Sequence, residues 1–91
     1  MICFAKSNKG LMQCLGPCVY IKPHFVRFSD QFPNISFASL DVDEVPAVAQ
    51  QFQVTRFPNF LFWKRGRLVD RFLGSDDSGL RDAIATFSGG E

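Results

Sequence analysis

The stretch Cys14-Leu15-Gly16-Pro17-Cys18 opens the part of the chain that decides its fold. After it, apolar residues recur at the spacing of one helical face, and they are Ile21, Phe25, Phe28 and Phe32. Pro23 lies inside this pattern, where a proline removes a backbone hydrogen bond and should kink a helix. The pattern therefore predicts a kinked amphipathic helix that opens at Gly16-Pro17-Cys18 and ends before Pro33.

Downstream of this helix, the pattern predicts a strand, a helix, two strands and a final helix. The strands are expected at 35–42, 59–63 and 68–73, the second helix at 45–52, and the last helix carries Leu80, Ala83, Ile84 and Phe87 on its apolar face. A strand, a helix and a second strand in succession favour a parallel pair, and the hairpin at 64–67 adds an antiparallel one. The predicted class is α/β, with a mixed central sheet flanked by helices on both faces.

Composition limits what the chain can be. With 91 residues it is one small domain, and 46% hydrophobic residues with eleven phenylalanines favour a core built from rings. A formal net charge of +1 does not indicate binding to nucleic acid or to an anionic membrane. The apolar run at 60–63 is too short to span a bilayer, and residues 1–5 lack the features of a signal peptide. We expect a soluble, cytoplasmic protein.

The cysteines point to thiol chemistry rather than to a metal centre. Zinc needs four ligands, and three cysteines with one distant histidine do not form a paired set, so no metal is expected. In a reducing compartment, cysteines close in sequence, such as Cys14 and Cys18, are more often catalytic than structural. Cys3 stands apart and is expected to be a buried thiol.

The chain resembles the thioredoxin family from about Cys14 to Phe87. The matching segments, in order, are Gly16-Pro17-Cys18, Ile21-Lys22-Pro23, Leu40-Asp41-Val42-Asp43-Glu44, Phe57-Pro58-Asn59-Phe60, the strand and turn from Phe62 to Gly66, Val69-Asp70, and Gly74. The resemblance implies a thioredoxin-like fold in a single domain, 1–91, with an atypical segment at 1–13 and a thioredoxin-like body at 14–88.

The resemblance also implies a reaction and its partners. In this family a thiolate at a helix N-terminus attacks a protein disulfide, and a second cysteine three residues on resolves the mixed disulfide. It implies a cis proline at Pro58, with the backbone of Phe57 pairing with the substrate main chain, and a substrate surface that includes Leu15, Gly16 and Pro17. The implied partners are protein disulfides and thioredoxin reductase, with no cofactor.

The active-site motif departs from the family. Thioredoxins read Trp-Cys-Gly-Pro-Cys, so Leu15 stands where the attacking cysteine belongs and only Cys18 keeps its place. In one interpretation, Cys14 attacks and pairs with Cys18, because residues four apart on a helix have Cα atoms about 6 Å apart, within the usual disulfide range. Cys14 would lie further from the helix dipole, so exchange would be weaker than in an intact thioredoxin.

Two other interpretations stay open. The domain could be a redox-inactive or monothiol binding module that uses the surface around Leu15, Gly16, Pro17 and Phe57 to contact an apolar partner. Alternatively, the first stretch of the chain is an aberrant product, and the thioredoxin body has lost its site without gaining another.

The segment at 1–13 also departs from the family. The best register makes Ile2–Ala5 the central strand and Lys6–Gln13 an inserted loop, because lysines in the middle of a covered sheet are implausible. The first strand and helix of the family are then missing or altered, and its buried aspartate would fall on Lys9 or Cys3. We expect impaired resolution of a mixed disulfide, and an unpaired sheet edge that could form a dimer.

Overall fold

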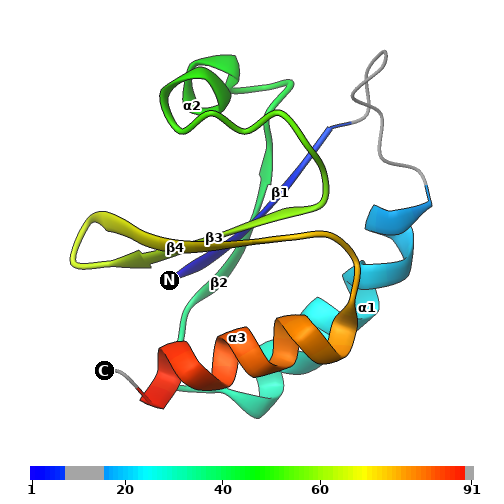
Figure 1. Ribbon diagram of the computed structural model, residues 1–91, viewed down its shortest axis with the longest axis vertical. Helices are drawn as coiled ribbons and strands as arrows, with labels where there is room; N and C mark the ends of the chain where they lie inside the picture. Colours follow the sequence, from blue (N-terminus) through cyan, green and yellow to red (C-terminus); the bar gives the residue numbers. More distant parts are fainter. Residues whose placement is uncertain (8–15, 90–91) are drawn as a thin grey trace.

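The computed structural model describes residues 1–7 and 16–89, which form one mixed sheet and three helices (Figure 1). The strands are β1 (Ile2–Lys6), β2 (Phe37–Asp41), β3 (Asn59–Lys64) and β4 (Arg67–Leu73), and the helices are α1 (Pro17–Gln31), α2 (Pro46–Gln51) and α3 (Asp77–Gly89). The sheet order is β2-β1-β3-β4. The order and type of elements predicted from the sequence are confirmed.

The strand β1 lies between two neighbours of opposite direction. It pairs in parallel with β2 and antiparallel with β3, and β3 continues into the antiparallel hairpin with β4. The gapped register is thereby confirmed, with one correction: Lys6, expected in the loop, is the last residue of β1 and is paired with Asp41. Lys6 is only half-buried at the end of the strand, so its ammonium group is not enclosed by the sheet.

The strand β2 is shorter than the predicted 35–42. The backbone N–H of Ile35 donates to the carbonyl of Phe32 at 3.1 Å, which closes a turn directly after α1. Ile35 is buried, although it lies outside the strand. Ile35 is therefore apolar because it packs into the core from a turn, and not because it belongs to the sheet.

Two apolar cores cover the two faces of the sheet, because successive side chains of a strand point to opposite faces. Phe60 and Phe62 enter the α1–α3 core, whose other buried members are Ile2, Phe4, Cys18, Ile21, Phe25, Phe28, Ile35, Leu80 and Ile84. Leu61 enters the α2 core with Cys3, Ala5, Val42 and Val54. Figure 1 shows α1 and α3 together on one side of the sheet and α2 on the other, as predicted.

Aromatic rings form the centre of the α1–α3 core. Phe4 stacks on Phe60 with ring centroids 5.1 Å apart, and it meets Phe25 edge-on at 5.5 Å. Phe62 meets Phe87 of α3 edge-on at 5.4 Å. These offset and edge-to-face geometries are the favourable ones for aromatic pairs. The high phenylalanine content of the chain is thus explained by the contact of β1 and β3 with α1 and α3.

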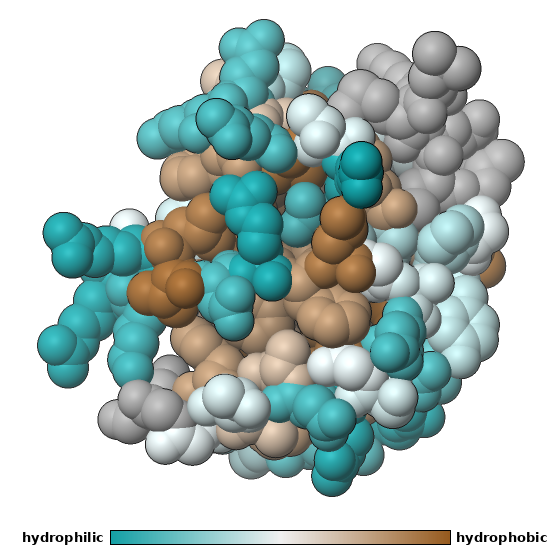
Figure 2. Space-filling view, viewed as in Figure 1, coloured by the Kyte–Doolittle hydropathy of each residue, from teal (hydrophilic) through white to brown (hydrophobic). Residues whose placement is uncertain are grey.

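The outer strand β4 leaves apolar side chains on the surface. Val69 and Leu73 are exposed, and Figure 2 shows hydrophobic side chains in the middle of this face, with hydrophilic ones both between them and around the margin. Among the described residues, no helix has both the length and the hydropathy needed to cross a membrane.

Candidate functional site

The site is built on the first turn of α1. Gly16 is the N-cap residue and Pro17 the first helical residue, and the N–H of Tyr20 donates to the carbonyl of Gly16 at 3.0 Å. A proline fits this place because the first N–H groups of a helix have no partner within it. No acidic residue lies in this turn, so the positive end of the helix dipole beside Cys18 is not opposed by a carboxylate on α1.

The three cysteines have different surroundings. Cys18 is 7% exposed, belongs to the α1–α3 core and is disulfide-bonded. Cys3 is a free, buried thiol in the α2 core, and its burial raises its pKa above the ordinary value. Cys3 is therefore a poor nucleophile, in agreement with its predicted role as a small apolar residue. The remaining cysteine, Cys14, lies outside the described residues, as does Leu15.

The loop before β3 carries Phe57 and Pro58, the two residues that the resemblance to thioredoxins places at the substrate site. The peptide bond between them is cis, as the resemblance implies, and Pro58 is fully buried. Phe57 is half-buried and packs against both cores, including the one that contains Cys18. The structure therefore brings Phe57 into the cluster of Cys18.

The end of β4 fixes this loop. The N–H of Gly74 donates to the carbonyl of Pro58 at 2.9 Å. Gly74 has φ of +109°, a conformation that residues with a Cβ rarely adopt, so glycine is required to make this hydrogen bond without strain. The hydrogen bond ties the loop of Pro58 to the segment that leads into α3.

A polar contact that no sequence motif indicates joins α1 to the start of α3. The hydroxyl of Tyr20 donates to Oδ1 of Asp77 at 2.8 Å, and Nδ1 of His24 lies 3.8 Å from Oδ2 of the same carboxylate. The rings of Tyr20 and His24 are 5.0 Å apart. Tyr20 is two residues after Cys18, so this contact holds the first turn of α1 against α3.

The hydrogen bond between Tyr20 and Asp77 shifts the pKa values of these two side chains in opposite directions. It is the main reason that the pKa of Asp77 lies below its ordinary value of 3.8, because the bond stabilises the carboxylate. The same bond raises the pKa of Tyr20 above 10.0, because ionisation would remove the donated proton. At pH values between the lowered pKa of Asp77 and the raised pKa of Tyr20, the tyrosine keeps its proton and the aspartate is ionised, so the hydrogen bond is fully formed.

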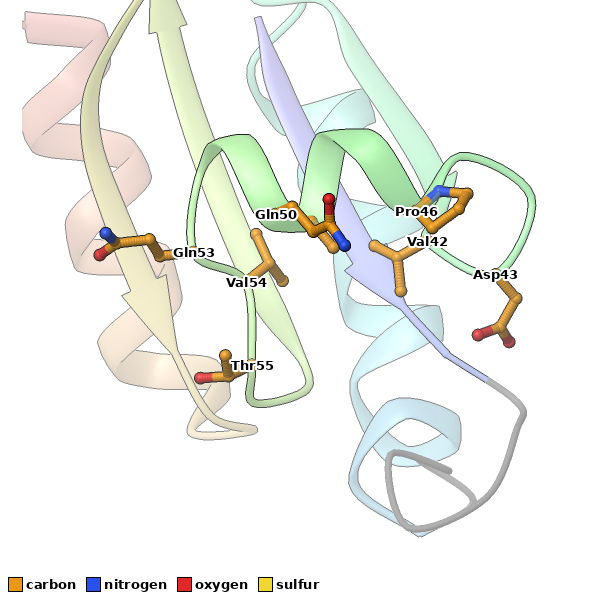
Figure 3. A pocket seen from close by; sticks show the side chains of 8 residues that line it. Val42, Asp43, Pro46, Gln50, Gln53, Val54 and Thr55 are labelled. Carbon is orange, nitrogen blue, oxygen red and sulfur yellow. The ribbon is translucent and has the colours of Figure 1, made fainter.

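Another candidate site, a cavity of about 580 Å³, lies beside α2 and is lined by Val42, Asp43, Pro46, Ala49, Gln50, Gln53, Val54 and Thr55. Figure 3 shows that these side chains come from α2 and the segments flanking it. None of them is a site residue predicted from the sequence. Asp43 accepts a hydrogen bond from the hydroxyl of the buried Ser7 at 2.8 Å, which ties the segment between β2 and α2 to the end of β1.

A thioredoxin family model matches residues 12–86. The chain belongs to the thioredoxin family. It is 44% identical over 70 residues to thioredoxin-2 of Pyricularia oryzae, an alignment covering 77% of this chain and 41% of that protein. It is 39% identical over 71 residues to thioredoxin-2 of Saccharomyces cerevisiae, covering 78% and 68%. The chain thus spans less than half of the first relative's length and about two thirds of the second's.

Solved thioredoxins have the same fold. The structure of Fasciola hepatica thioredoxin matches with a TM-score of 0.83 and 32% identity, covering 94% of this chain and 78% of the other. Oxidised mitochondrial thioredoxin 3 of Saccharomyces cerevisiae matches with a TM-score of 0.82 and 27% identity, covering 93% and 76%. The predicted thioredoxin-like fold is confirmed.

Replacing Tyr20 with phenylalanine tests the contact between α1 and α3. In Tyr20→Phe, the pKa of Asp77 should rise towards 3.8, because the carboxylate loses its hydrogen bond. In Asp77→Asn, the pKa of Tyr20 should fall towards 10.0. Both are measured by NMR titration of the side-chain resonances.

The two pKa shifts determine how the contribution of this contact to the free energy of unfolding changes with pH. The contact's contribution should be lost as pH falls through the lowered pKa of Asp77, and again as pH rises through the raised pKa of Tyr20. An unchanged pKa of Asp77 in Tyr20→Phe would show that the hydrogen bond does not form in solution.

Proposed function

We propose that the chain is a thiol–disulfide oxidoreductase that acts on protein disulfides, with Cys14 as the attacking and Cys18 as the resolving cysteine. The observation that carries the proposal is the placement of Cys18 in the first turn of α1, in one cluster with Phe57 of the cis-proline loop. That Cys18 is disulfide-bonded while Cys3 is free supports a pairing that leaves Cys3 out. Membership of the thioredoxin family supports the same chemistry.

The reaction transfers two electrons to the substrate. The thiolate of Cys14 attacks one sulfur of a substrate disulfide, and the other substrate sulfur leaves as a thiolate that takes up a proton. The thiolate of Cys18 then attacks the Cys14 sulfur of the mixed disulfide and releases the second substrate thiol. The protein ends with a Cys14–Cys18 disulfide, which an external dithiol must reduce before the next turnover.

The local structure supports different roles for the two cysteines, with Cys14 attacking the substrate and Cys18 resolving the mixed disulfide. The burial of Cys18 suits a group that meets only a sulfur already bound to the protein. The unpaired N–H groups of the first turn of α1 favour its thiolate. Cys14 precedes Pro17, the first helical residue, by three positions, so we expect a weaker dipole effect on its pKa and slower attack than in an intact thioredoxin.

In this proposal Gly16, Pro17 and Leu15 belong to the substrate surface, and the backbone of Phe57 pairs with the substrate main chain beside Pro58. An added Cβ on Gly16 would meet no atom within 4 Å among the described residues, so the space beside it is open. Thioredoxin reductase is the proposed reductant. We place the reaction in the cytoplasm, which fractionation of the source cells would test.

A second candidate function is a binding module without redox turnover. It is favoured by Leu15 at the position of the attacking cysteine and by the exposed apolar side chains that follow Cys18, because Val19 is 67% and Tyr20 52% exposed. In that case partner binding would survive both Cys14→Ser and Cys18→Ser. An exchange enzyme would lose its turnover in both variants.

Turnover of a protein disulfide separates the two functions. With insulin as substrate and dithiothreitol as reductant, the wild type should exceed the rate of dithiothreitol alone, and Cys14→Ser should return to that rate. Pre-reduced Cys18→Ser, mixed with insulin after dithiothreitol has been removed, should accumulate a mixed disulfide detectable by mass spectrometry, because the protein then has no second cysteine at the site to resolve it. Cys3→Ala is the matched control and should keep its activity. A wild-type rate no higher than dithiothreitol alone, or full activity in Cys14→Ser, would contradict the proposal.

We also propose that two copies pair through β2. The carbonyl of Ser36 accepts from Ile2, and the N–H of Val42 donates to Lys6, so these residues direct their backbone groups towards β1. In a parallel ladder alternate residues bond to the same neighbour, so Phe37, Ser39 and Asp41 direct theirs outwards. Among the described residues no strand pairs with that outer edge.

Removing one outward donor tests this pairing. Ser39→Pro should shift the protein towards monomer in sedimentation velocity, because proline has no N–H to donate to a second copy. Ser39→Ala is the control and should associate like the wild type. A wild type that stays monomeric up to about millimolar concentration would exclude pairing through β2.

A further inference from the structure

A positively charged side chain, that of Arg56, lies next to the cis-proline loop. Arg56 is exposed and immediately precedes Phe57 and the cis Pro58. Among the described residues it takes part in no ion pair with a carboxylate. Its charge is therefore available to a molecule that contacts this loop.

The carboxylates of the neighbouring segment are already engaged elsewhere. Gly74, which is hydrogen-bonded to Pro58, leads into Asp76 and Asp77. Oδ1 of Asp76 accepts from the hydroxyl of Ser78 at 3.0 Å and from the N–H of Gly79 at 3.3 Å, as a cap at the start of α3. Asp77 accepts from Tyr20.

The first turn of α1, which carries Cys18, adds no negative charge to the site. No acidic residue lies in the first turn of α1, and Lys22, one turn after Cys18, is exposed. A molecule that contacts Phe57 therefore lies beside the positive charge of Arg56. The described carboxylate of Asp43 lines the same cavity as Thr55 and accepts a hydrogen bond from Ser7. The carboxylates on the next segment are held in contacts within the protein.

We propose that Arg56 is a specificity-determining residue that selects substrates with an acidic side chain beside the reactive cysteine. This inference rests on the proposed exchange function and names its substrate class. If the backbone of Phe57 pairs with the substrate main chain, the side chain of the preceding residue lies opposite a substrate residue next to the paired one. An opposite charge at that position is favourable, and a like charge directly opposite is unfavourable.

The expected preference is modest. Cross-strand charge pairs change rates of association and binding by up to about fivefold, and exposed pairs are screened by salt. The preference should therefore be clear at low ionic strength and should shrink as salt is added. Apolar contact with Val19 or Phe57 would not show this salt dependence, because it involves no net charge.

Two synthetic peptides test the proposal. Each carries one cysteine as a mixed disulfide with 2-mercaptoethanol, and they differ only in having Glu or Lys next to that cysteine. The wild type should reduce the Glu peptide about two- to fivefold faster in kcat/KM than the Lys peptide. Arg56→Gln should abolish the difference and Arg56→Glu should reverse it.

A matched variant controls for net charge. Arg67→Gln removes the same charge at the β3–β4 turn, which Figure 1 places at the end of the sheet away from the start of α1, and it should keep the wild-type preference. Equal rates for the two peptides in the wild type would overturn the proposal. An unchanged preference in Arg56→Gln would overturn it too.

Failure of this inference is distinguishable from failure of the exchange function. The neutral probe bis(2-hydroxyethyl) disulfide should be reduced equally by wild type, Arg56→Gln and Arg67→Gln. If it is reduced while the charged peptides are not distinguished, only the role of Arg56 is wrong. If no disulfide is reduced, the same peptides with Ser for Cys are titrated by NMR, and equal affinity for both excludes selection by Arg56.

Discussion

The pairing of β1 with both of its neighbours is the interaction on which the rest of the structure depends. Its five residues give the sheet its order, because β2 joins one side in parallel and β3 joins the other antiparallel. Its side chains also enter both cores, Phe4 among the rings of the α1–α3 core and Ala5 in the α2 core. The first residue adds to this pairing, since the terminal ammonium group donates to the carbonyl of Trp63 at 2.9 Å.

The geometry of the candidate site follows from that arrangement. The rings on β1 and β3 provide the surface on which α1 packs through Ile21, Phe25 and Phe28, and this packing fixes the end of α1 that carries Cys18. Because β3 begins directly after Pro58, its pairing with β1 and β4 also fixes the cis-proline loop. The two parts of the site are therefore held by the same sheet, although they are about 40 residues apart in the sequence.

Much of the fold could be predicted because its patterns are local and strong. The spacing of apolar residues in α1 and the turn between β3 and β4 each specify one element. The strand at Ile2–Lys6 could be found by asking which segment a covered sheet would accept, since lysines exclude the ungapped alternative. The boundaries of β2 could not be predicted, because Ile35 is buried in a turn and is as apolar as a strand residue.

The site was less predictable for a physical reason. The contact of Tyr20 with Asp77 joins residues 57 positions apart, and neither periodicity nor a local motif reports such a contact. Gly16, Pro17, Cys18, Phe57 and Pro58 were identified from motifs that the structure gathers at α1 and the cis-proline loop. The roles of Cys14 and Leu15 stay predictions, because both lie outside the described residues.

The proposed exchange reaction requires that Cys14 and Cys18 form a reversible dithiol–disulfide pair. A redox titration against glutathione or dithiothreitol, with alkylation and mass spectrometry at each potential, tests it most directly. One intramolecular Cys14–Cys18 disulfide is expected, with a potential of about −200 to −270 mV, together with a thiol at Cys3 throughout. If no intramolecular disulfide forms at any potential, or if Cys3 is one of the paired cysteines, Cys14 and Cys18 are not the exchanging pair.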